Sequence, residues 1–232
     1  MDVEVFDNVD SVSRAAASTI ASDARDAVAA RGRFTMAVSG GKAPWEMLRA
    51  LANEDVPWKD VHVFQIDERI APAGDPDRNL THLRESLLEH APLPPNQIYA
   101  MPVESSDLQA AAVDYAETLS RVAGSPAVLD LSHLGMGPDG HTASLVPDDP
   151  VLNVTNADVA LTGMYMGRRR MTLTFPIINR SRRILWLITG SEKVPMFARL
   201  RQADPTIPAG RISQTQALIM ADRAATGQMD TR

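Results

Sequence analysis

An aspartate and a histidine stand two positions apart in a loop that is rich in glycine. The loop spans residues 135–141, Gly-Met-Gly-Pro-Asp-Gly-His, and follows the apolar run 128–134, which predicts a buried strand. Glycine and proline favour an irregular backbone that a ligand can approach closely. Histidine is the side chain whose unperturbed pKa suits a base at neutral pH. The loop therefore predicts a ligand site in which His141 is the general base and Asp139 orients it, since a spacing of two residues permits their contact.

A second glycine-rich turn predicts an anion site. Residues 39–44, Ser-Gly-Gly-Lys-Ala-Pro, follow the apolar run 34–38 and precede a helix predicted over residues 45–53. Free backbone amides and the positive end of the helix dipole both attract an anion at such a position. A cation there is unfavourable by roughly 0.3 to 1 kcal/mol unless an anion binds beside it. Lys42 therefore either joins a phosphate site with Ser39, Gly40 and Gly41, or points to solvent.

Charged residues also stand at the ends of two further predicted strands. Asp67, Glu68 and Arg69 end the alternating run 61–66, where such a tripeptide is on its own more typical of a solvated cluster. Lys193 lies on the first turn of a helix that we expect from Gly190 through Leu200, so it too calls for an anionic partner. Parallel strands bring their carboxyl ends to one edge of a sheet, where ligands bind.

The loop resembles a known signature. Residues 134–145 read Leu-Gly-Met-Gly-Pro-Asp-Gly-His-Thr-Ala-Ser-Leu, and the 6-phosphogluconolactonase family carries Leu-Gly-x-Gly-x-Asp-Gly-His-Thr-Ala-Ser-Leu. Three more motifs are similar to the family in the same order, at residues 39–44, 67–79 and 190–193, so the resemblance covers nearly the whole chain. An arginine before a Thr-Leu-Thr strand, Arg170 here, also matches.

The chain departs from the family in two motifs. The family usually has Ser-Gly-Gly-Ser-Thr-Pro at the first turn, so Lys42 and Ala43 replace two hydroxyl groups. The family has Ser-Asn at the end of the second motif, where this chain has Arg78-Asn79. Arg78 either adds positive charge near a phosphate or lies exposed at the start of a helix.

The resemblance implies hydrolysis of 6-phospho-D-glucono-1,5-lactone to 6-phospho-D-gluconate in the oxidative pentose phosphate pathway, with no cofactor and no metal. His141 would activate water, Asp139 would orient it, and Arg69 would stabilise negative charge. Gly137 and Gly140 would let the backbone pass close to the sugar and offer amides to the oxyanion, and Asp67 and Glu68 would fix Arg69 or bind sugar hydroxyls. The expected substrate and phosphate contacts are Ser39, Gly40, Gly41, Lys42, Asp67, Glu68, Asn79, Gly137, Gly140, Arg170 and Lys193.

Two other functions stay open. Glucosamine-6-phosphate deaminases share the fold and an Asp-Gly-His loop, but their loop continues Ile-Ala-Phe-Asn-Glu-Pro, whereas this chain has Thr-Ala-Ser-Leu-Val-Pro at residues 142–147. A non-catalytic sugar-phosphate-binding module would bind the product without turning over the lactone. Ser144 is not expected to be a nucleophile, because no Gly-x-Ser-x-Gly surrounds it.

Composition narrows the class of protein. The chain has 232 residues, 44% of them hydrophobic, and a net charge of −6, which suits one large domain and argues against a nucleic-acid surface. It has no cysteine, no run of about 20 apolar residues and no basic, apolar leader. Four histidines are too dispersed to predict a metal site, and we expect a cytoplasmic enzyme of a small sugar phosphate, without a membrane partner, as a monomer or homodimer. These histidines are His62, His82, His90 and His133, the last expected to be a satisfied core residue.

The elements that must position these residues alternate between strand and helix. This order predicts an α/β fold: a single-domain, three-layer, mostly parallel sheet with helices on both faces, Rossmann-like and of the sugar-phosphate isomerase/lactonase type, over residues 1–232 with a disordered tail at 229–232. Asp10 or Ser11 is expected to cap the first helix, and Thr142 to open another. The strands are predicted at 3–6, 34–38, 61–66, 98–101, 128–134, 159–166, 171–175, 184–189 and 216–220, and the helices at 12–31, 45–53, 80–90, 108–122, 142–145 and 190–200.

Overall fold

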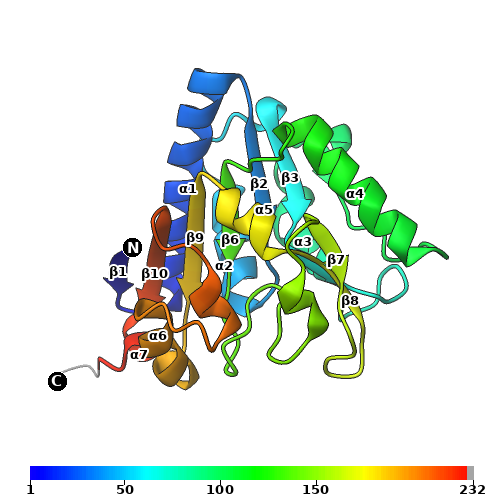
Figure 1. Ribbon diagram of the computed structural model, residues 1–232. Helices are drawn as coiled ribbons and strands as arrows, with labels where there is room; N and C mark the ends of the chain where they lie inside the picture. The colour runs from blue at the N-terminus through cyan, green and yellow to red at the C-terminus, as the bar shows by residue number, and fades with distance from the viewer. Residues whose placement is uncertain (229–232) are drawn as a thin grey trace.

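A seven-stranded sheet, all of whose neighbouring strands pair in parallel, runs through the centre of the protein (Figure 1). A computed structural model describes residues 1–228. The strand order is β1-β10-β9-β6-β2-β3-β5. This confirms the predicted α/β class. The strands are β1 (Asp2–Phe6), β2 (Phe34–Val38), β3 (Val61–Gln65), β5 (Ile98–Tyr99), β6 (Leu131–Leu134), β9 (Arg183–Ile188) and β10 (Ala217–Asp222).

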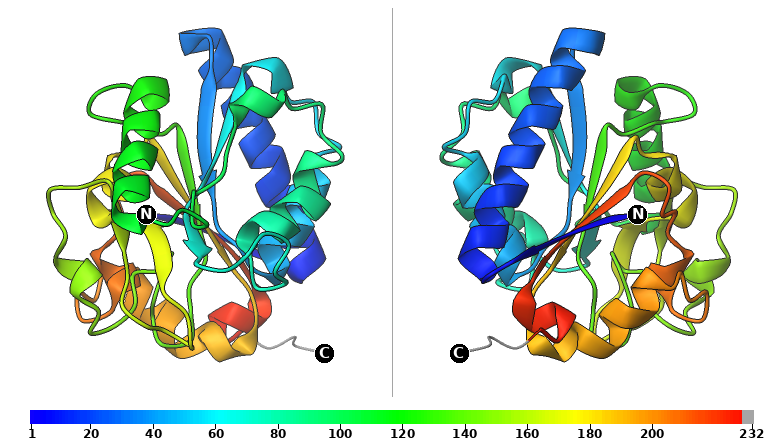
Figure 2. Two further views of the ribbon diagram at one scale, coloured as in Figure 1. Left: turned by 90° about the vertical axis from the view of Figure 1, so that its right-hand side faces the viewer. Right: turned by 90° about the vertical axis from the view of Figure 1, so that its left-hand side faces the viewer.

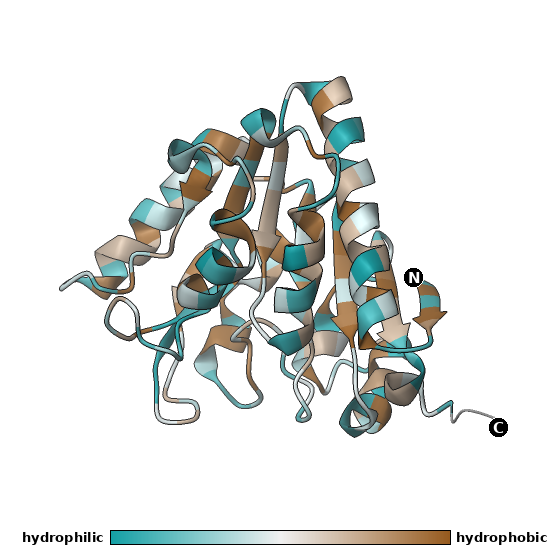
Figure 3. Cartoon of the chain, turned by 180° about the vertical axis from the view of Figure 1, so that it is seen from behind, coloured by the Kyte–Doolittle hydropathy of each residue, from teal (hydrophilic) through white to brown (hydrophobic). Residues whose placement is uncertain are grey.

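Helices cover both faces of this sheet, as predicted for three layers. Figure 2 shows α1 on one side of the strands and α4 on the other, and Figure 3 shows largely hydrophobic strands behind helices that carry many hydrophilic residues. The strands alternate accordingly: Leu185 and Leu187 of β9 pack into one half of the core, and Trp186 into the other. The helices are α1 (Val9–Arg31), α2 (Lys42–Leu51), α3 (Asn79–Leu83), α4 (Leu108–Ala123), α5 (Phe175–Arg180), α6 (Val194–Arg201) and α7 (Arg223–Thr226).

Helix α1 starts three residues earlier than predicted. Its N-cap is Asn8, whose side chain accepts a hydrogen bond from the Ser11 backbone while the Ser11 hydroxyl accepts from the Asn8 backbone. The predicted caps, Asp10 and Ser11, therefore lie inside the first turn, because this reciprocal capping box satisfies two free amides at once. The helix ends at Gly32 in the left-handed conformation, as expected.

A second, antiparallel sheet stands beside the first, and the sequence did not reveal it. It contains β4 (Asp67–Arg69), β8 (Arg170–Leu173) and β7 (Val159–Leu161), in the order β4-β8-β7. Strands β7 and β8 are shorter than predicted because a tight hairpin turn follows Tyr165, where Met166 and Gly167 have φ of 50° and 78°.

The helix predicted from Thr142 does not form. Ala143 has φ of 53°, and Thr142 and Leu145 instead pair as an isolated antiparallel bridge. The Thr142 hydroxyl donates to the Gly135 carbonyl and the Ser144 hydroxyl donates to Asp67, so hydrogen bonds to distant groups outcompete the helical ones.

Several other boundaries differ from the prediction. The helix expected over 80–90 is α3 followed by a π-helical turn over Arg84–Leu88, and the strand expected from Val128 begins only at Leu131. Helix α5 was missed altogether, since its first residue was assigned to a strand. The predicted tail at 229–232 lies outside the described residues. Within residues 1–228, no helix is long and apolar enough to cross a membrane.

Candidate active site

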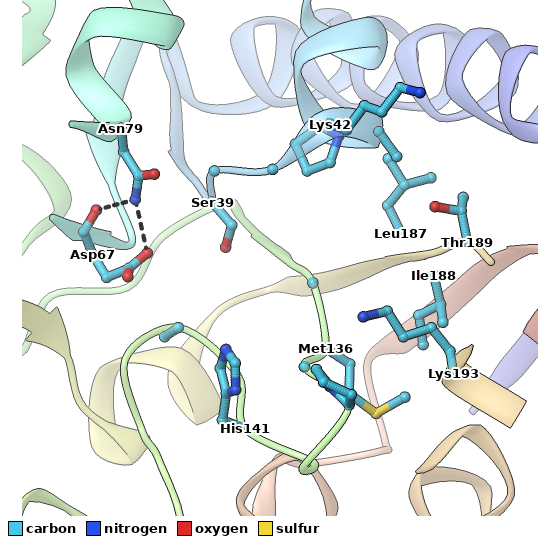
Figure 4. A pocket seen from close by; sticks show the side chains of 18 of the residues that line it. Ser39, Lys42, Asp67, Asn79, Met136, His141, Leu187, Ile188, Thr189 and Lys193 are labelled. Carbon is cyan, nitrogen blue, oxygen red and sulfur yellow. Dashed lines mark hydrogen bonds between the residues drawn. The ribbon is translucent and has the colours of Figure 1, made fainter. Parts of the chain in front are cut away.

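A cavity of about 350 Å³ opens at the carboxyl ends of β2, β6 and β9, with the small sheet as a side wall. It is large enough for a small organic ligand. From β2 the chain moves to β3 on one side, and from β6 it moves to β9 on the other, so the cavity lies where the strand order reverses. The predicted turns at 39–44 and 135–141 both line it (Figure 4).

His141 and Asp139 are in direct contact inside this site. His141 Nδ1 lies 2.6 Å from Asp139 Oδ1, and the His141 backbone amide donates to the same oxygen at 3.1 Å. The Tyr165 hydroxyl donates to the other oxygen, Asp139 Oδ2, at 2.9 Å. His141 lines the cavity, and Asp139 stands behind it. A carboxylate that accepts from Nδ1–H leaves Nε2 of the ring unprotonated and free to take a proton.

The environment keeps Asp139 ionised. Partial burial acts to raise the pKa of Asp139, but hydrogen bonds from the His141 backbone and ring and from Tyr165 favour the carboxylate, and the net effect lowers that pKa. The charge that orients the His141 ring is therefore present at neutral pH.

Gly137 and Gly140 do not offer amides to a ligand. The Gly137 amide donates to the His141 carbonyl at 2.8 Å, and the Gly140 amide donates to the Gly137 carbonyl at 3.1 Å, so both are used inside the loop. Gly137 is needed for a different reason, because a Cβ at this position would overlap the His141 ring. Gly140 does not line the cavity, and a Cβ there would press on Ile207. The predicted amide contribution to the oxyanion is thus wrong.

Glu68 is fully buried and does not line the cavity. Its two oxygens accept from the backbone amides of Arg69, Asn79 and Leu80. Of the two predicted roles, fixing Arg69 and binding sugar hydroxyls, the structure thus favours the first. Arg78, also buried, pairs with Glu68 and Glu104 and does not line the cavity, so neither alternative predicted for it is correct.

Asn79 links the side wall to the first glycine turn. Its amide nitrogen donates to the Asp67 carbonyl at 2.9 Å, and its Oδ1 accepts from Arg69 Nη1 at 2.9 Å. A Cβ on Gly40 would overlap the Asn79 side chain. Asp67 lines the cavity and accepts a hydrogen bond from the Ser144 hydroxyl at 2.6 Å. Asp67, Asn79 and Gly40 therefore fix the relative positions of the turn and the small sheet.

Two arginines of the small sheet face each other at the cavity. Arg69 of β4 and Arg170 of β8 are directly paired in register, and both line the cavity. Their Nε atoms are buried and find no hydrogen-bond partner within residues 1–228. Burial, reinforced by the charge of Arg69, lowers the pKa of Arg170, although nearby Asp67 opposes this shift. Like charges opposite each other are destabilising, so this pair is best explained by an anion that binds between or beside them.

The two lysines of the cavity point in different directions. Figure 4 shows the Lys193 amine extending into the cavity and the Lys42 amine turned away from His141. The Lys193 ammonium lies 3.5 Å from Glu192, a loose pairing. Lys42 is exposed, which matches the second alternative predicted for it, a side chain that points to solvent. The backbone of Gly40 and Gly41 nevertheless lines the cavity. The Ser39 hydroxyl donates to the His133 carbonyl at 2.9 Å, so it anchors this turn to β6.

His133 was expected to be a satisfied core histidine, and it is only half satisfied. It is fully buried, and Nδ1 accepts from the Ser39 amide at 3.4 Å. Its Nε2 has no partner in the part of the chain that the structure describes. Burial lowers the pKa of His133 from 6.5 to about 4, so the ring is neutral at physiological pH.

Sequence reasoning missed three residues that shape the site. Tyr165 contacts Asp139, Ser144 contacts Asp67, and Glu192 lies beside Lys193 in the cavity lining. No motif marks Tyr165, because it reaches the site only through the turn that ends the β7–β8 hairpin. Ser144 belongs to the recognised loop, but its partner is 77 residues away in the sequence.

Comparisons with known proteins agree on one relationship. A family model described as Glucosamine-6-phosphate isomerases/6-phosphogluconolactonase matches residues 7–220. The 6-phosphogluconolactonase of Mycobacterium tuberculosis is 36% identical over 241 residues, which cover 98% of this chain and 98% of that protein. The 6-phosphogluconolactonase of Synechocystis is 36% identical over 196 residues, which cover 82% of this chain and 81% of that protein.

Solved structures give the same picture. A 6-phosphogluconolactonase from Shewanella baltica superposes with a TM-score of 0.83 at 28% identity, covering 96% of this chain and 97% of that one. A monomeric glucosamine-6-phosphate deaminase superposes with a TM-score of 0.86 at 17% identity, covering 99% and 100% of the two chains, and this likeness shows the fold alone.

Proposed function

The chain belongs to the glucosamine-6-phosphate isomerase/6-phosphogluconolactonase family, and we propose that it hydrolyses 6-phospho-D-glucono-1,5-lactone to 6-phospho-D-gluconate in the oxidative pentose phosphate pathway. The observation that carries this proposal is the His141–Asp139 pair, held at 2.6 Å in a cavity that also contains three inward cationic side chains. These cations are Arg69, Arg170 and Lys193. The cytoplasmic location expected from the sequence stays a prediction.

His141 acts as the general base in this scheme. With Nδ1–H donated to Asp139, Nε2 removes a proton from a water molecule as its oxygen attacks the lactone carbonyl carbon. The carbonyl oxygen gains negative charge in the tetrahedral intermediate. When the ring C–O bond breaks, the imidazolium returns the proton to the leaving ring oxygen, which becomes the hydroxyl of the product acid. One water is consumed, and His141 is regenerated.

Arg69 stabilises the developing oxyanion. Its Nη1 is fixed by the Asp77 carbonyl at 2.6 Å and by Asn79 at 2.9 Å, while its Nε is buried without a partner inside residues 1–228. A donor that is held in place before the reaction begins stabilises new charge without having to reorganise.

The phosphate of the substrate is held by Arg170, Lys193 and the turn at residues 39–42. The turn stands at the N-terminus of α2, whose dipole favours an anion. Arg170 brings a guanidinium that fits phosphate oxygens, and Lys193 brings a point charge from the start of α6. Together these groups compensate a dianion inside a protein whose net charge is −6.

The test compares wild type with His141→Ala and His90→Ala. Freshly generated 6-phosphogluconolactone is supplied, and 6-phosphogluconate is followed with a coupled dehydrogenase against the spontaneous background. His90 is exposed and hydrogen-bonds to the Glu85 carbonyl, so it serves as a matched control. We expect His141→Ala to lower kcat by about 10²–10⁴-fold, as removal of a general base does, and His90→Ala to match wild type.

Two outcomes would overturn the proposal. No acceleration of lactone hydrolysis by the wild type would exclude the lactonase, and turnover of glucosamine 6-phosphate by the same preparation would identify a deaminase instead. Binding of 6-phosphogluconate without turnover of either substrate would identify the non-catalytic module. Nothing in residues 1–228 specifically favours either rival. In the stretch after the histidine, where the deaminases carry a carboxylate, this chain has Ser144, whose hydroxyl donates a hydrogen bond to Asp67.

A further inference from the structure

Tyr165 reaches the candidate base from outside both glycine loops. Its hydroxyl donates to Asp139 Oδ2 at 2.9 Å and lies 3.4 Å from His141 Nδ1. Its ring stands edge-on to the His141 ring, with centroids 5.4 Å apart and an interplanar angle of 68°. The Arg170 guanidinium lies over the Tyr165 ring, 5.0 Å from its centroid. One side chain therefore contacts the base, its orienting carboxylate and a cation of the cavity.

The β7–β8 hairpin delivers this side chain. The backbones of Tyr165 and Arg168 exchange two hydrogen bonds across the turn, at 3.0 and 3.2 Å. Arg168 in turn forms ion pairs with Asp75 and Asp77, both at 3.0 Å, which fasten the hairpin to a neighbouring loop. Met164 and Met166, on either side of Tyr165, are 68% and 81% exposed, so alternation along the hairpin turns only the tyrosine inward.

The contacts of Asp139 show what the hydroxyl does. One carboxylate oxygen accepts from the His141 ring and backbone, and the other accepts from Tyr165. With both oxygens bound to separate elements, the carboxylate cannot rotate about its own axis without losing a hydrogen bond. The phenol also draws charge from the carboxylate and lowers its pKa, which limits how strongly Asp139 favours the protonated ring of His141.

We propose that Tyr165 is a positioning residue of this site, whose hydroxyl fixes the Asp139–His141 pair and whose ring fixes the guanidinium of Arg170. This proposal rests on the proposed lactonase function for its kinetic consequences. The hydroxyl and the ring act on different parts of the substrate: the first on the reacting carbonyl, through His141, and the second on the phosphate, through Arg170. Removing them separately should therefore separate kcat from KM.

The charged groups around His141 define what the pH dependence measures. Asp139 and Tyr165 contact His141 directly, Arg170 lies behind Tyr165, and Asp67, Arg69, Glu192 and Lys193 line the rest of the cavity. A change of Tyr165 to Phe removes one neutral donor and no charge from this set. Asp139 then keeps more of its negative charge and holds a proton on the ring more strongly. The acid limb of the kcat profile should move to higher pH.

The experiment uses Tyr165→Phe, Tyr165→Leu and the control Tyr99→Phe in the full chain. Tyr99 hydrogen-bonds to His62 at 3.1 Å and does not line the cavity. We expect Tyr165→Phe to lower kcat roughly 10-fold, as loss of a hydrogen bond to a charged group does, with KM unchanged. Tyr165→Leu should in addition raise KM roughly 3-fold, the loss expected for a cation–π contact whose ring is only half-buried. Tyr99→Phe should match wild type.

A second readout is independent of catalysis. NMR follows the titration of the His141 imidazole, assigned by its loss in His141→Ala. In Tyr165→Phe the midpoint should lie at higher pH than in wild type, and in Tyr99→Phe it should stay where it is in wild type. If this shift is seen but no variant and no wild type hydrolyses the lactone, the proposed function fails and the positioning role stands. An unchanged midpoint, or equal effects of Phe and Leu on KM, would overturn the role of Tyr165.

Discussion

Two arginine clusters stand at opposite edges of the central sheet, and they are paired very differently. At the carboxyl edge, Arg69 and Arg170 face one another, and each leaves a buried Nε without a partner within residues 1–228. At the amino edge, Arg31 and Arg182 converge on Asp130, at 2.7 and 3.3 Å. Within residues 1–228, Arg69 and Arg170 thus form no ion pair, whereas Arg31 and Arg182 share one carboxylate.

The amino edge has the features of a structural cluster. Asp130 is buried and also accepts from the Thr35 amide at 2.8 Å and from the Thr35 hydroxyl at 3.0 Å. It ties the start of β6 to the end of α1 and the start of β2. Every one of these bonds is made between groups of the protein itself, so the cluster stabilises the fold and has no need of a ligand.

The difference teaches how to recognise a functional arginine in this fold. Position at a strand end does not distinguish the two clusters, and neither does local charge density. What distinguishes them is whether the cation is compensated inside the protein, because a desolvated and unpaired donor is costly unless something binds it. Substitutions of these arginines and of Asp130 test that criterion.

Among the arginine substitutions, the largest effect is expected from Arg69→Met. Loss of one fixed donor to the oxyanion should lower kcat about 100–1000-fold, for the phosphorylated lactone and for plain glucono-1,5-lactone alike. Steady-state kinetics on both substrates measure this. Arg31→Met, at the amino edge, is the matched control and should leave kcat unchanged. Equal losses of kcat in the two variants would refute the distinction between the edges.

Asp130→Asn should destabilise the protein without affecting catalysis. The change leaves Arg31 and Arg182 without their carboxylate, and since both arginines are partly exposed, water screens part of the loss; we expect the free energy of unfolding to fall by about 2 kcal/mol. The kcat of the folded fraction should be unchanged. Urea denaturation, followed by fluorescence, gives the first quantity. A variant that is fully stable but inactive would place Asp130 in the reaction and remove the contrast.

His133 tests an unpaired buried atom that lies outside the cavity. Because burial lowers the pKa of His133 from 6.5 to about 4, the unfolded chain binds a proton between these pH values that the folded chain does not. The stability that depends on neutral His133 is therefore complete above pH 6.5 and is lost as the pH falls towards 4. At pH 5 the loss should be roughly 2 kcal/mol relative to pH 7.5.

A comparison of wild type with His133→Asn isolates the contribution of His133 to this loss of stability. The free energy of unfolding of both proteins is measured at pH 7.5, 6 and 5, and it should fall more steeply with decreasing pH in wild type. In the variant, the asparagine side-chain oxygen should accept the hydrogen bond that the Ser39 amide donates to His133 Nδ1. Parallel declines in the two proteins would mean that His133 takes up its proton at a similar pH in the folded and unfolded chains, and the loss of stability would then belong to other groups.

Much of this site could be predicted from the sequence because the glycine loops are local. Residues 39–42 and 135–141 each follow a strand, and their spacing places them at one edge of a parallel sheet whatever the remaining contacts are. The contact between Asp139 and His141 is likewise decided within one turn. These residues were found, and the fold class with them.

The small sheet could not be predicted, for a physical reason. Its strands β4 and β8 are about 100 residues apart in the sequence, and β4 is only three residues long, too short for a periodic pattern. The pairing of Arg69 with Arg170, the burial of Arg78 and the inward turn of Tyr165 all depend on this long-range contact. Sequence reasoning therefore identified the charged residues without their partners. It placed Glu68 among the substrate contacts and left Arg78 either near a phosphate or exposed at a helix start.

Arg170→Met and Lys193→Met should each raise KM for the phosphorylated lactone about 10-fold, the cost of one charge-assisted contact. Neither should affect plain glucono-1,5-lactone, because that substrate has no phosphate to lose. This selectivity separates the two phosphate cations from Arg69, whose loss should lower kcat for both substrates. If Lys193→Met lowered kcat for the unphosphorylated lactone as strongly as for the natural one, Lys193 would act at the carbonyl and the assignment of the cations would have to be reversed.

The smallest effect is expected from Arg168→Ala, although Arg168 is only two residues from Arg170. Within the run 168–170, Arg170 is buried at the cavity, whereas Arg168 is half-buried and Arg169 is exposed. The Arg168 guanidinium is already bound to Asp75 and Asp77, and partial exposure to water reduces what these pairs contribute. We expect the free energy of unfolding to change by about 0.5 kcal/mol and kcat and KM to change less than 3-fold, with both effects vanishing at 1 M salt. Hydrogen bonds across the hairpin turn should keep Tyr165 in place in the variant. A 10-fold loss of kcat would show that nearness to the cavity, and not the absence of an internal partner, makes an arginine functional here.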